Sequence, residues 1–180
     1  ILLECPTLNF ADSAKSVAAY VSDYIHQTGD PVAIEHCQKM KSGHYPDRDV
    51  LVELLKFLGY VKEKKLRNYL HGISYEAYAA SFSTAGITND MWAKSEMHLS
   101  KLLKDRAIVD DYLPVLKGLK KPILLLKGKY DPCCSDHQTQ YVKGLPNATV
   151  VEFYNSGHFP RIEETEKYIE TILKFFRNQS

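Results

Sequence analysis

The sequence is poor in the features that mark several specialised classes of protein. No apolar run approaches the ~20 residues that a membrane-spanning helix needs, and the net charge is only +1. The densest basic stretch, residues 62–65, includes an acid and is typical of a solvated helix face, not of a nucleic-acid surface. Cysteine is also scarce, and Cys5, Cys37, Cys133 and Cys134 lack the spacing of a zinc site. We therefore expect a cytoplasmic protein with reduced thiols that binds neither nucleic acid nor membrane.

The chain also lacks the features of an N-terminal targeting segment. It has no initiator methionine and begins directly on the apolar run Ile1-Leu2-Leu3, which Pro6 closes. This run lacks the basic region and the longer apolar segment of a signal peptide. A predicted strand that starts at residue 1 indicates a chain that was cut or processed from a longer protein.

What is present is an ordinary globular composition, with 44% hydrophobic and 25% charged residues, in a chain long enough for one domain with a real core. Three short stretches predict buried strands: residues 1–4, 122–128 and 148–153. A helix is expected between the last two strands, over residues 135–143, and another over residues 161–177, where apolar residues repeat at helical spacing. This order predicts a parallel α/β unit with a right-handed crossover.

The long stretch between the first and second predicted strands, residues 12–117, carries almost no strand signal. Four helices are expected in it, each opened by a capping side chain. The candidate caps, in chain order, are Asp12 or Ser13, Asp30 before Pro31, Asp47 or Asp49, and Asn89 or Asp90. The third of these helices is expected to turn Leu55 inward and to stop at Gly59. An all-helical block therefore interrupts the α/β unit.

Two short motifs carry polar residues, and each follows a predicted strand. Asp131 follows the strand that ends at Gly128, and His158 follows the strand that ends at Phe153. Parallel strands bring their carboxyl ends to one edge of the sheet, so these loops can bring a carboxylate and an imidazole together. A carboxylate bonded to one ring nitrogen fixes the histidine tautomer, and the other nitrogen can then serve a nucleophile as general base. Gly128 and Gly157 are interpreted as positions that the backbone geometry requires.

Taken singly, Asp131 is also explained as a turn residue and His158 as a loop histidine. Together, in this order, they resemble the C-terminal tail of the α/β-hydrolase fold family. The tail reads PILLLKGKYD and, further on, LPNATVVEFYNSGHFPRIEETEKYIETILKFF. The family's chain order of nucleophile, acid and histidine implies that Asp131 is the catalytic acid and His158 the catalytic histidine.

The resemblance implies an α/β fold: the C-terminal part of an α/β-hydrolase parallel sheet with an inserted all-helical cap. It implies that residues 1–11 are a core strand of the hydrolase domain and residues 12–117 the helical cap, or lid. Residues 118–180 are then the C-terminal part of the hydrolase core. In outline the chain is most similar to proline-iminopeptidase-like enzymes, and less so to their esterase and haloalkane-dehalogenase relatives.

The nucleophile that the family needs is missing from these 180 residues. No Gly-x-Ser-x-Gly elbow occurs, because Ser42-Gly43 and Gly72-Ile73-Ser74 lack the flanking glycines. His71-Gly72 is likewise a false match to the family's oxyanion motif. The resemblance therefore implies a serine hydrolase whose nucleophile lies on an N-terminal segment of the same hydrolase, with a small ester or a short peptide as substrate. It implies no cofactor and no metal, since a serine triad needs none. The alternative is a non-catalytic interaction module that lacks the nucleophile.

Other chemistry-bearing residues admit a structural interpretation, which is favoured. His36 and His44 do not have the spacing of a metal pair. The remaining histidines are interpreted as surface or capping residues: His26, His71, His98 and His137. Cys133 and Cys134 are interpreted as packing thiols.

Aromatic residues of the helical stretch either line a substrate pocket or pack the helices together, and packing is the more common reason. These residues are Tyr20, Tyr24, Tyr75, Tyr78 and Trp92. By analogy with the aminopeptidase relatives, Glu35 is a candidate for binding a substrate amino group. Ser74 and Ser156 are the serines to mutate first if the chain alone hydrolyses an ester.

Overall fold

A parallel sheet of three strands lies at the centre of the molecule. The computed structural model describes residues 1–45, 49–61, 69–84, 86–105 and 107–178. Strands β1 (Leu2–Glu4), β2 (Ile123–Gly128) and β3 (Ala148–Phe153) lie in the order β1-β2-β3, with Leu3 opposite Leu125 and Leu125 opposite Val150. Every residue of β2 is buried, as expected for a parallel strand that is covered on both faces.

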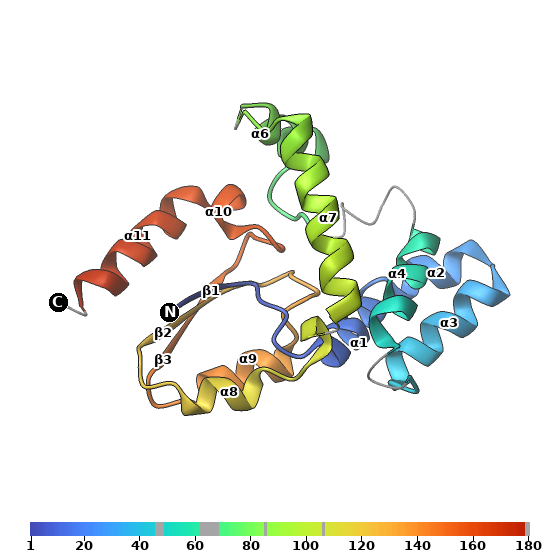
Figure 1. The fold of residues 1–180 in the computed structure, drawn as a ribbon, viewed down its shortest axis with the longest axis horizontal. Helices are drawn as coiled ribbons and strands as arrows, with labels where there is room; N and C mark the ends of the chain where they lie inside the picture. The colour runs from blue at the N-terminus through green and yellow to red at the C-terminus, as the bar shows by residue number, and fades with distance from the viewer. Residues whose placement is uncertain (46–48, 62–68, 85, 106, 179–180) are drawn as a thin grey trace.

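Helices cover both faces of this sheet (Figure 1). On one face, α8 (Leu113–Gly118) and α9 (Asp136–Lys143) pack against Ile123 and Leu125 of β2. On the other face, α11 (Thr165–Arg177) packs Phe175 against Leu124 and Leu126. Alternate residues of β2 therefore serve opposite cores, as the two-residue period of a strand requires.

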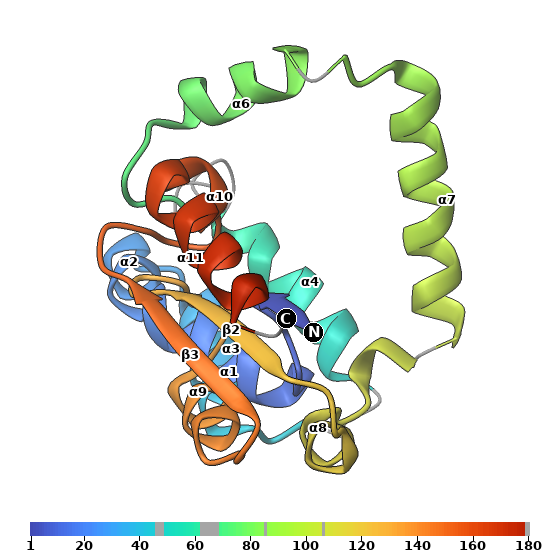
Figure 2. The same ribbon diagram turned by 90° about the vertical axis from the view of Figure 1, so that its left-hand side faces the viewer.

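The stretch between β1 and β2 is helical wherever the structure describes it as regular. It contains α1 (Phe10–Tyr20), α2 (Ser22–Thr28), α3 (Pro31–Ser42), α4 (Val50–Val61), α6 (Tyr75–Thr84), α7 (Asn89–Asp105) and the short 3₁₀ helix η1 (Ala107–Val109). Helices α1 to α4 share a core of their own, in which Ile25, Cys37 and Phe57 are fully buried. Figure 2 shows α6 and α7 arching away from this bundle.

The predicted strands are confirmed, and the predicted helices are found with differences in their bounds and caps. The fourth predicted helix, α7, begins at Asn89, so neither Asn89 nor Asp90 caps it. The Thr88 hydroxyl accepts from the N–H of Met91 at 3.3 Å. The second helical cap is as expected, because the Asp30 side chain accepts hydrogen bonds from the N–H groups of Val32 and Ala33. The first helix begins earlier than predicted, since Asn9 caps it by accepting from the N–H of Asp12.

Three predictions for the third and last helices are wrong. Gly59 does not end α4, which continues to the fully buried Val61, and Leu55 is exposed while Phe57 takes the inward position. The predicted single helix over residues 161–177 is two helices, α10 (Pro160–Glu163) and α11, because the backbone of Glu164 leaves the helical region, with φ of −134° and ψ of 56°. The candidate cap Asp47 lies outside the described residues, and the division into residues 1–11, 12–117 and 118–180 stays a prediction.

None of the helices in the described ranges combines the length and the apolar character that crossing a bilayer demands.

Candidate active site

The loop after β2 holds Asp131 in a turn that several hydrogen bonds stabilise. The N–H of Asp131 donates to the carbonyl of Gly128 at 3.0 Å. The buried ammonium group of Lys127 donates to the carbonyl oxygens of Gly128 and Asp131, at 2.9 and 3.0 Å. The Asp131 carboxylate is itself fully buried and accepts from the N–H groups of Cys133 and Cys134, at 2.9 and 3.0 Å. Such donors compensate the burial of an ionised carboxylate.

The loop after β3 brings His158 onto this carboxylate. Nδ1 of His158 lies 2.8 Å from Oδ1 of Asp131. The imidazole is 28% exposed, whereas the Asp131 side chain is fully covered. An Nδ1–H bonded to a carboxylate leaves Nε2 as the nitrogen that can take a proton. The structure therefore brings together the two residues that the sequence singled out.

Glycines allow the loops at this edge of the sheet to approach one another. A Cβ on Gly128 would lie 1.7 Å from the carbonyl oxygen of Gly157, and a Cβ on Gly157 would lie 2.2 Å from that of Tyr69. Neither position can therefore carry a side chain without moving backbone. This agrees with the interpretation of both glycines as positions set by backbone geometry.

Cys5 is a neighbour of the pair that the sequence did not single out. It follows β1, has a left-handed backbone with φ of 40°, and is 2% exposed. Its sulfur accepts from the N–H of Gly128 at 3.3 Å and lies 3.7 Å from the carbonyl oxygen of Gly157, so one thiol bridges the loops of Asp131 and His158. The sequence indicated Cys5 only by its position just after a predicted strand, which Asp131 and His158 share.

Cys5, Asp131 and His158 also form a cluster of metal-ligand types, with one ligand atom of each within 4.8 Å of the others. The bonding does not favour a metal. Nδ1 of His158 and Oδ1 of Asp131 bond each other, and both carboxylate oxygens accept backbone N–H groups. Burial, with the Asp131 charge nearby, raises the pKa of the Cys5 thiol far above its ordinary value. An ion would have to displace the first bond and deprotonate the thiol.

The buried thiols around Asp131 predict that the chain loses stability in alkali. The ordinary pKa of a cysteine thiol is 9.0. Burial raises the pKa of Cys5 and of Cys133 well above that value, and it raises the pKa of Cys134 to about 11. Because the unfolded thiols hold their protons less tightly, this stabilisation is complete below pH 9 and is lost as the pH rises toward 11. Each thiol should lower the free energy of unfolding by about 1.4 kcal/mol per pH unit in that window.

Urea unfolding between pH 8 and pH 11 measures this slope. The Cys134→Ala variant has one buried thiol fewer. Its free energy of unfolding should therefore fall less steeply with pH, by about 1.4 kcal/mol per pH unit. An unchanged slope in this variant would refute the contribution assigned to the Cys134 thiol.

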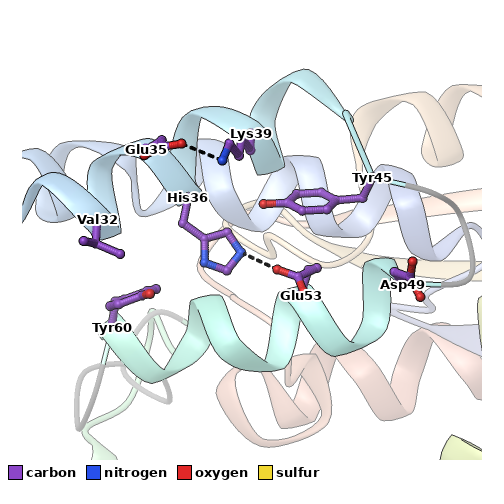
Figure 3. Close-up of a pocket in the computed structure, with 8 residues that line it drawn as sticks. All are labelled: Val32, Glu35, His36, Lys39, Tyr45, Asp49, Glu53 and Tyr60. Carbon is purple, nitrogen blue, oxygen red and sulfur yellow. Dashed lines mark ion pairs between the residues drawn. The ribbon is translucent and has the colours of Figure 1, made fainter.

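Two further sequence candidates lie elsewhere, in a pocket of about 380 Å³ between α3 and α4 (Figure 3). His36 lies 3.2 Å from a carboxylate oxygen of Glu53, and burial lowers the pKa of the imidazole. Glu35 pairs with Lys39 in solvent. Neither Asp131 nor His158 lines this pocket, so the structure does not bring Glu35 to the acid–histidine pair.

Ser74 and Ser156, the two serines within the chain that the sequence offered for mutation, form hydrogen bonds to residues other than His158. The Ser156 hydroxyl is buried and donates to Glu164 at 2.6 Å. The Ser74 hydroxyl accepts from the N–H of Ala77 at the start of α6. Of the aromatic candidates, Tyr20 lines a second pocket, of about 360 Å³, together with Asp131. Tyr78 packs on Phe159, the residue after His158, with ring centroids 4.8 Å apart.

The remaining candidates play local roles. His71 stacks on Tyr130 with ring centroids 3.5 Å apart, and His44 bonds the Ser42 hydroxyl. His26 bonds the carbonyl oxygen of Ser22, one turn earlier, at 2.8 Å. These contacts agree with the structural interpretation of the histidines.

Comparison with known proteins gives relatives in sequence and in structure. The chain is 34% identical over 85 residues to the proline iminopeptidase of Clostridium botulinum, a match to 47% of this chain and 27% of that protein. It is 29% identical over 103 residues to the proline iminopeptidase of Heyndrickxia coagulans, a match to 57% of this chain and 34% of that protein. No family model matches. The chain thus spans about a third, or less, of the curated relatives it matches.

Two solved structures share the fold. The proline iminopeptidase-related protein of Thermus thermophilus superposes with a TM-score of 0.57 and 19% identity, over 95% of this chain and 52% of that one. The structure of VinJ superposes with a TM-score of 0.51 and 13% identity, over 98% of this chain and 56% of that one. At these identities the likeness concerns the fold alone.

Proposed function

We propose that this chain, which has the fold of the α/β-hydrolase superfamily and matches its C-terminal part, supplies the acid and the histidine of a serine hydrolase. The observation that carries the proposal is the 2.8 Å contact between Asp131 and His158 at the carboxyl ends of adjacent parallel strands. The carboxylate is fully buried and held by backbone donors, while the imidazole is partly exposed. A buried acid behind an accessible base is the arrangement that general-base catalysis needs.

In this mechanism Asp131 holds the Nδ1–H of His158 and so keeps Nε2 free of a proton. Nε2 then accepts the proton of a serine hydroxyl as that oxygen attacks the ester or amide carbonyl, and Asp131 stabilises the imidazolium that forms. The same nitrogen returns the proton to the leaving alcohol or amine. None of these steps requires a cofactor.

The serine itself is proposed to lie on a segment of the same hydrolase that is N-terminal to Ile1. The 180 residues contain no Gly-x-Ser-x-Gly elbow, and the matched parts are only 27% and 34% of the curated relatives. The helices between β1 and β2 are proposed to be the cap. The names of the relatives favour a short peptide with an N-terminal proline as substrate, with simple esters as the other class. A cytoplasmic location is proposed from the four free cysteines.

Hydrolysis of prolyl p-nitroanilide and of a p-nitrophenyl ester by the full-length protein tests the proposal. We expect turnover of at least one of the two, and a loss of about 10⁴-fold or more in the His158→Ala variant. His98→Ala, at an exposed position of α7, is the matched control and should keep its activity. Turnover that survives His158→Ala would refute the assigned role, and no turnover of either substrate would favour a non-catalytic module.

A further inference from the structure

We propose that Glu163 is a positioning residue that holds His158 in place and couples it to residues 69–72, the segment that leads into α6. The role of the held histidine rests on the proposed function, whereas the coupling itself is a property of the fold. The proposal stands on four hydrogen bonds to the Glu163 carboxylate and on one backbone hydrogen bond from His158 to Tyr69.

One carboxylate oxygen binds the segment that leads into α6. Oε1 of Glu163 accepts from the N–H groups of His71 and Gly72, the second at 2.9 Å. The other oxygen binds the histidine loop. Oε2 accepts from the N–H of Gly157 at 2.8 Å and from that of Phe159 at 3.2 Å. The two residues that flank His158 are thus tied to the same side chain as the incoming segment.

The backbone of His158 makes the third link. Its N–H donates to the carbonyl oxygen of Tyr69 at 2.7 Å. The N–H groups of three successive residues, from Gly157 to Phe159, are therefore all bound either by Glu163 or by the segment that Glu163 holds. The side chain of Tyr69 also packs against the imidazole, with ring centroids 5.5 Å apart.

The two segments touch backbone to backbone, so a shift of one is transmitted directly. A Cβ on Gly72 would lie 2.6 Å from the carbonyl oxygen of Asn155, and a Cβ on Gly157 would lie 2.2 Å from that of Tyr69. In both Figure 1 and Figure 2, α6 leads away just above α10, the short helix that ends at Glu163. Any movement of α6 that displaces residues 69–72 would therefore move the histidine.

Only a carboxylate can serve all four donors. An ionised carboxylate offers acceptor sites on both oxygens, whereas glutamine offers one oxygen and an NH₂ group that would face two N–H groups. Hydrogen bonds to a charged acceptor are also stronger than neutral ones. Glu163→Gln keeps nearly the same side-chain shape. It removes the acceptor for the two N–H groups that its NH₂ group would face.

Hydrogen exchange and NMR on the full-length protein test the proposal without requiring turnover. In Glu163→Gln, amides of residues 71–72 and 157–159 should exchange about ten-fold faster or more, in both segments together. The downfield Nδ1 proton of His158 should broaden or disappear. Glu166→Gln changes an exposed carboxylate of α11 and should leave both signals as they are in the unchanged protein.

Faster exchange in only one segment, or in neither, would overturn the proposal, as would the same effect in Glu166→Gln. If Glu163→Gln does not fold, hydrogen exchange of the unchanged protein tests the coupling instead. Its two segments should show one common opening free energy across a denaturant series, and two different values would refute the coupling. Inactivity of the protein would count against the proposed function but not against this result.

Discussion

Replacing Asp131 by asparagine should lower the turnover of the full-length protein by about 10⁴-fold while leaving the fold intact. The amide of the new side chain would place an NH₂ group at one of the two oxygen positions of Asp131. At the Oδ2 position it would face the N–H of Cys134, and at the Oδ1 position it would face both the N–H of Cys133 and Nδ1 of His158. At the Oδ1 position the NH₂ group can donate to Nδ1, which moves the ring proton to Nε2. In that tautomer the histidine can no longer accept a proton from a nucleophile.

The measurement is kcat/KM for Asp131→Asn beside the exposed control Asp23→Asn on α2. We expect the loss to lie mainly in kcat, because the acid acts on the reacting histidine and not on substrate binding. A loss confined to KM, or a reduction below about ten-fold, would contradict the assigned acid.

The second large effect concerns association of the 180-residue chain when it is studied by itself. Strand β1 pairs only with β2 among the described strands, so its other edge is open, and Leu2 beside it is 37% exposed. Helix α11 exposes Ile169, Leu173 and Phe176 to about half of their surface each. An open strand edge beside uncovered apolar side chains favours edge-to-edge pairing. We expect a dimer or larger assemblies at micromolar concentration, and no ester turnover.

Light scattering coupled to size exclusion measures the mass. Leu2→Lys places a charge on the open edge, which opposes strand pairing, and should shift the population toward monomer. Val32→Lys, on an exposed position of α3, is the control and should not. A monodisperse monomer of the unchanged chain would refute the open-edge argument.

The individual strands, and the loops that carry Asp131 and His158, were predictable because each of them shows in the local sequence. Strands β2 and β3 are continuous apolar or β-branched runs between turn residues, and their ends place Asp131 and His158 at one edge. The α/β-hydrolase fold that the tail resembles is confirmed by the neighbours in structure.

Features that depend on contacts between distant residues were not predictable. Glu163 contacts residues 91 and 92 positions earlier in the chain, and Cys5 contacts residues more than 120 positions later. Helix α6 was missed because its sequence lacks a clear apolar stripe, and Gly59 lies within α4 because Val61 beyond it is buried in the helical core. In each case tertiary packing overrides a local preference.

The decisive measurement for the proposed hydrolase is identification of the serine that a fluorophosphonate labels in the full-length protein. We predict one labelled serine, within a Gly-x-Ser-x-Gly sequence that precedes Ile1, and labelling that His158→Ala abolishes. Labelling of a serine within residues 1–180, labelling that is unaffected by His158→Ala, or no labelling of the folded protein would contradict the proposed role of Asp131 and His158.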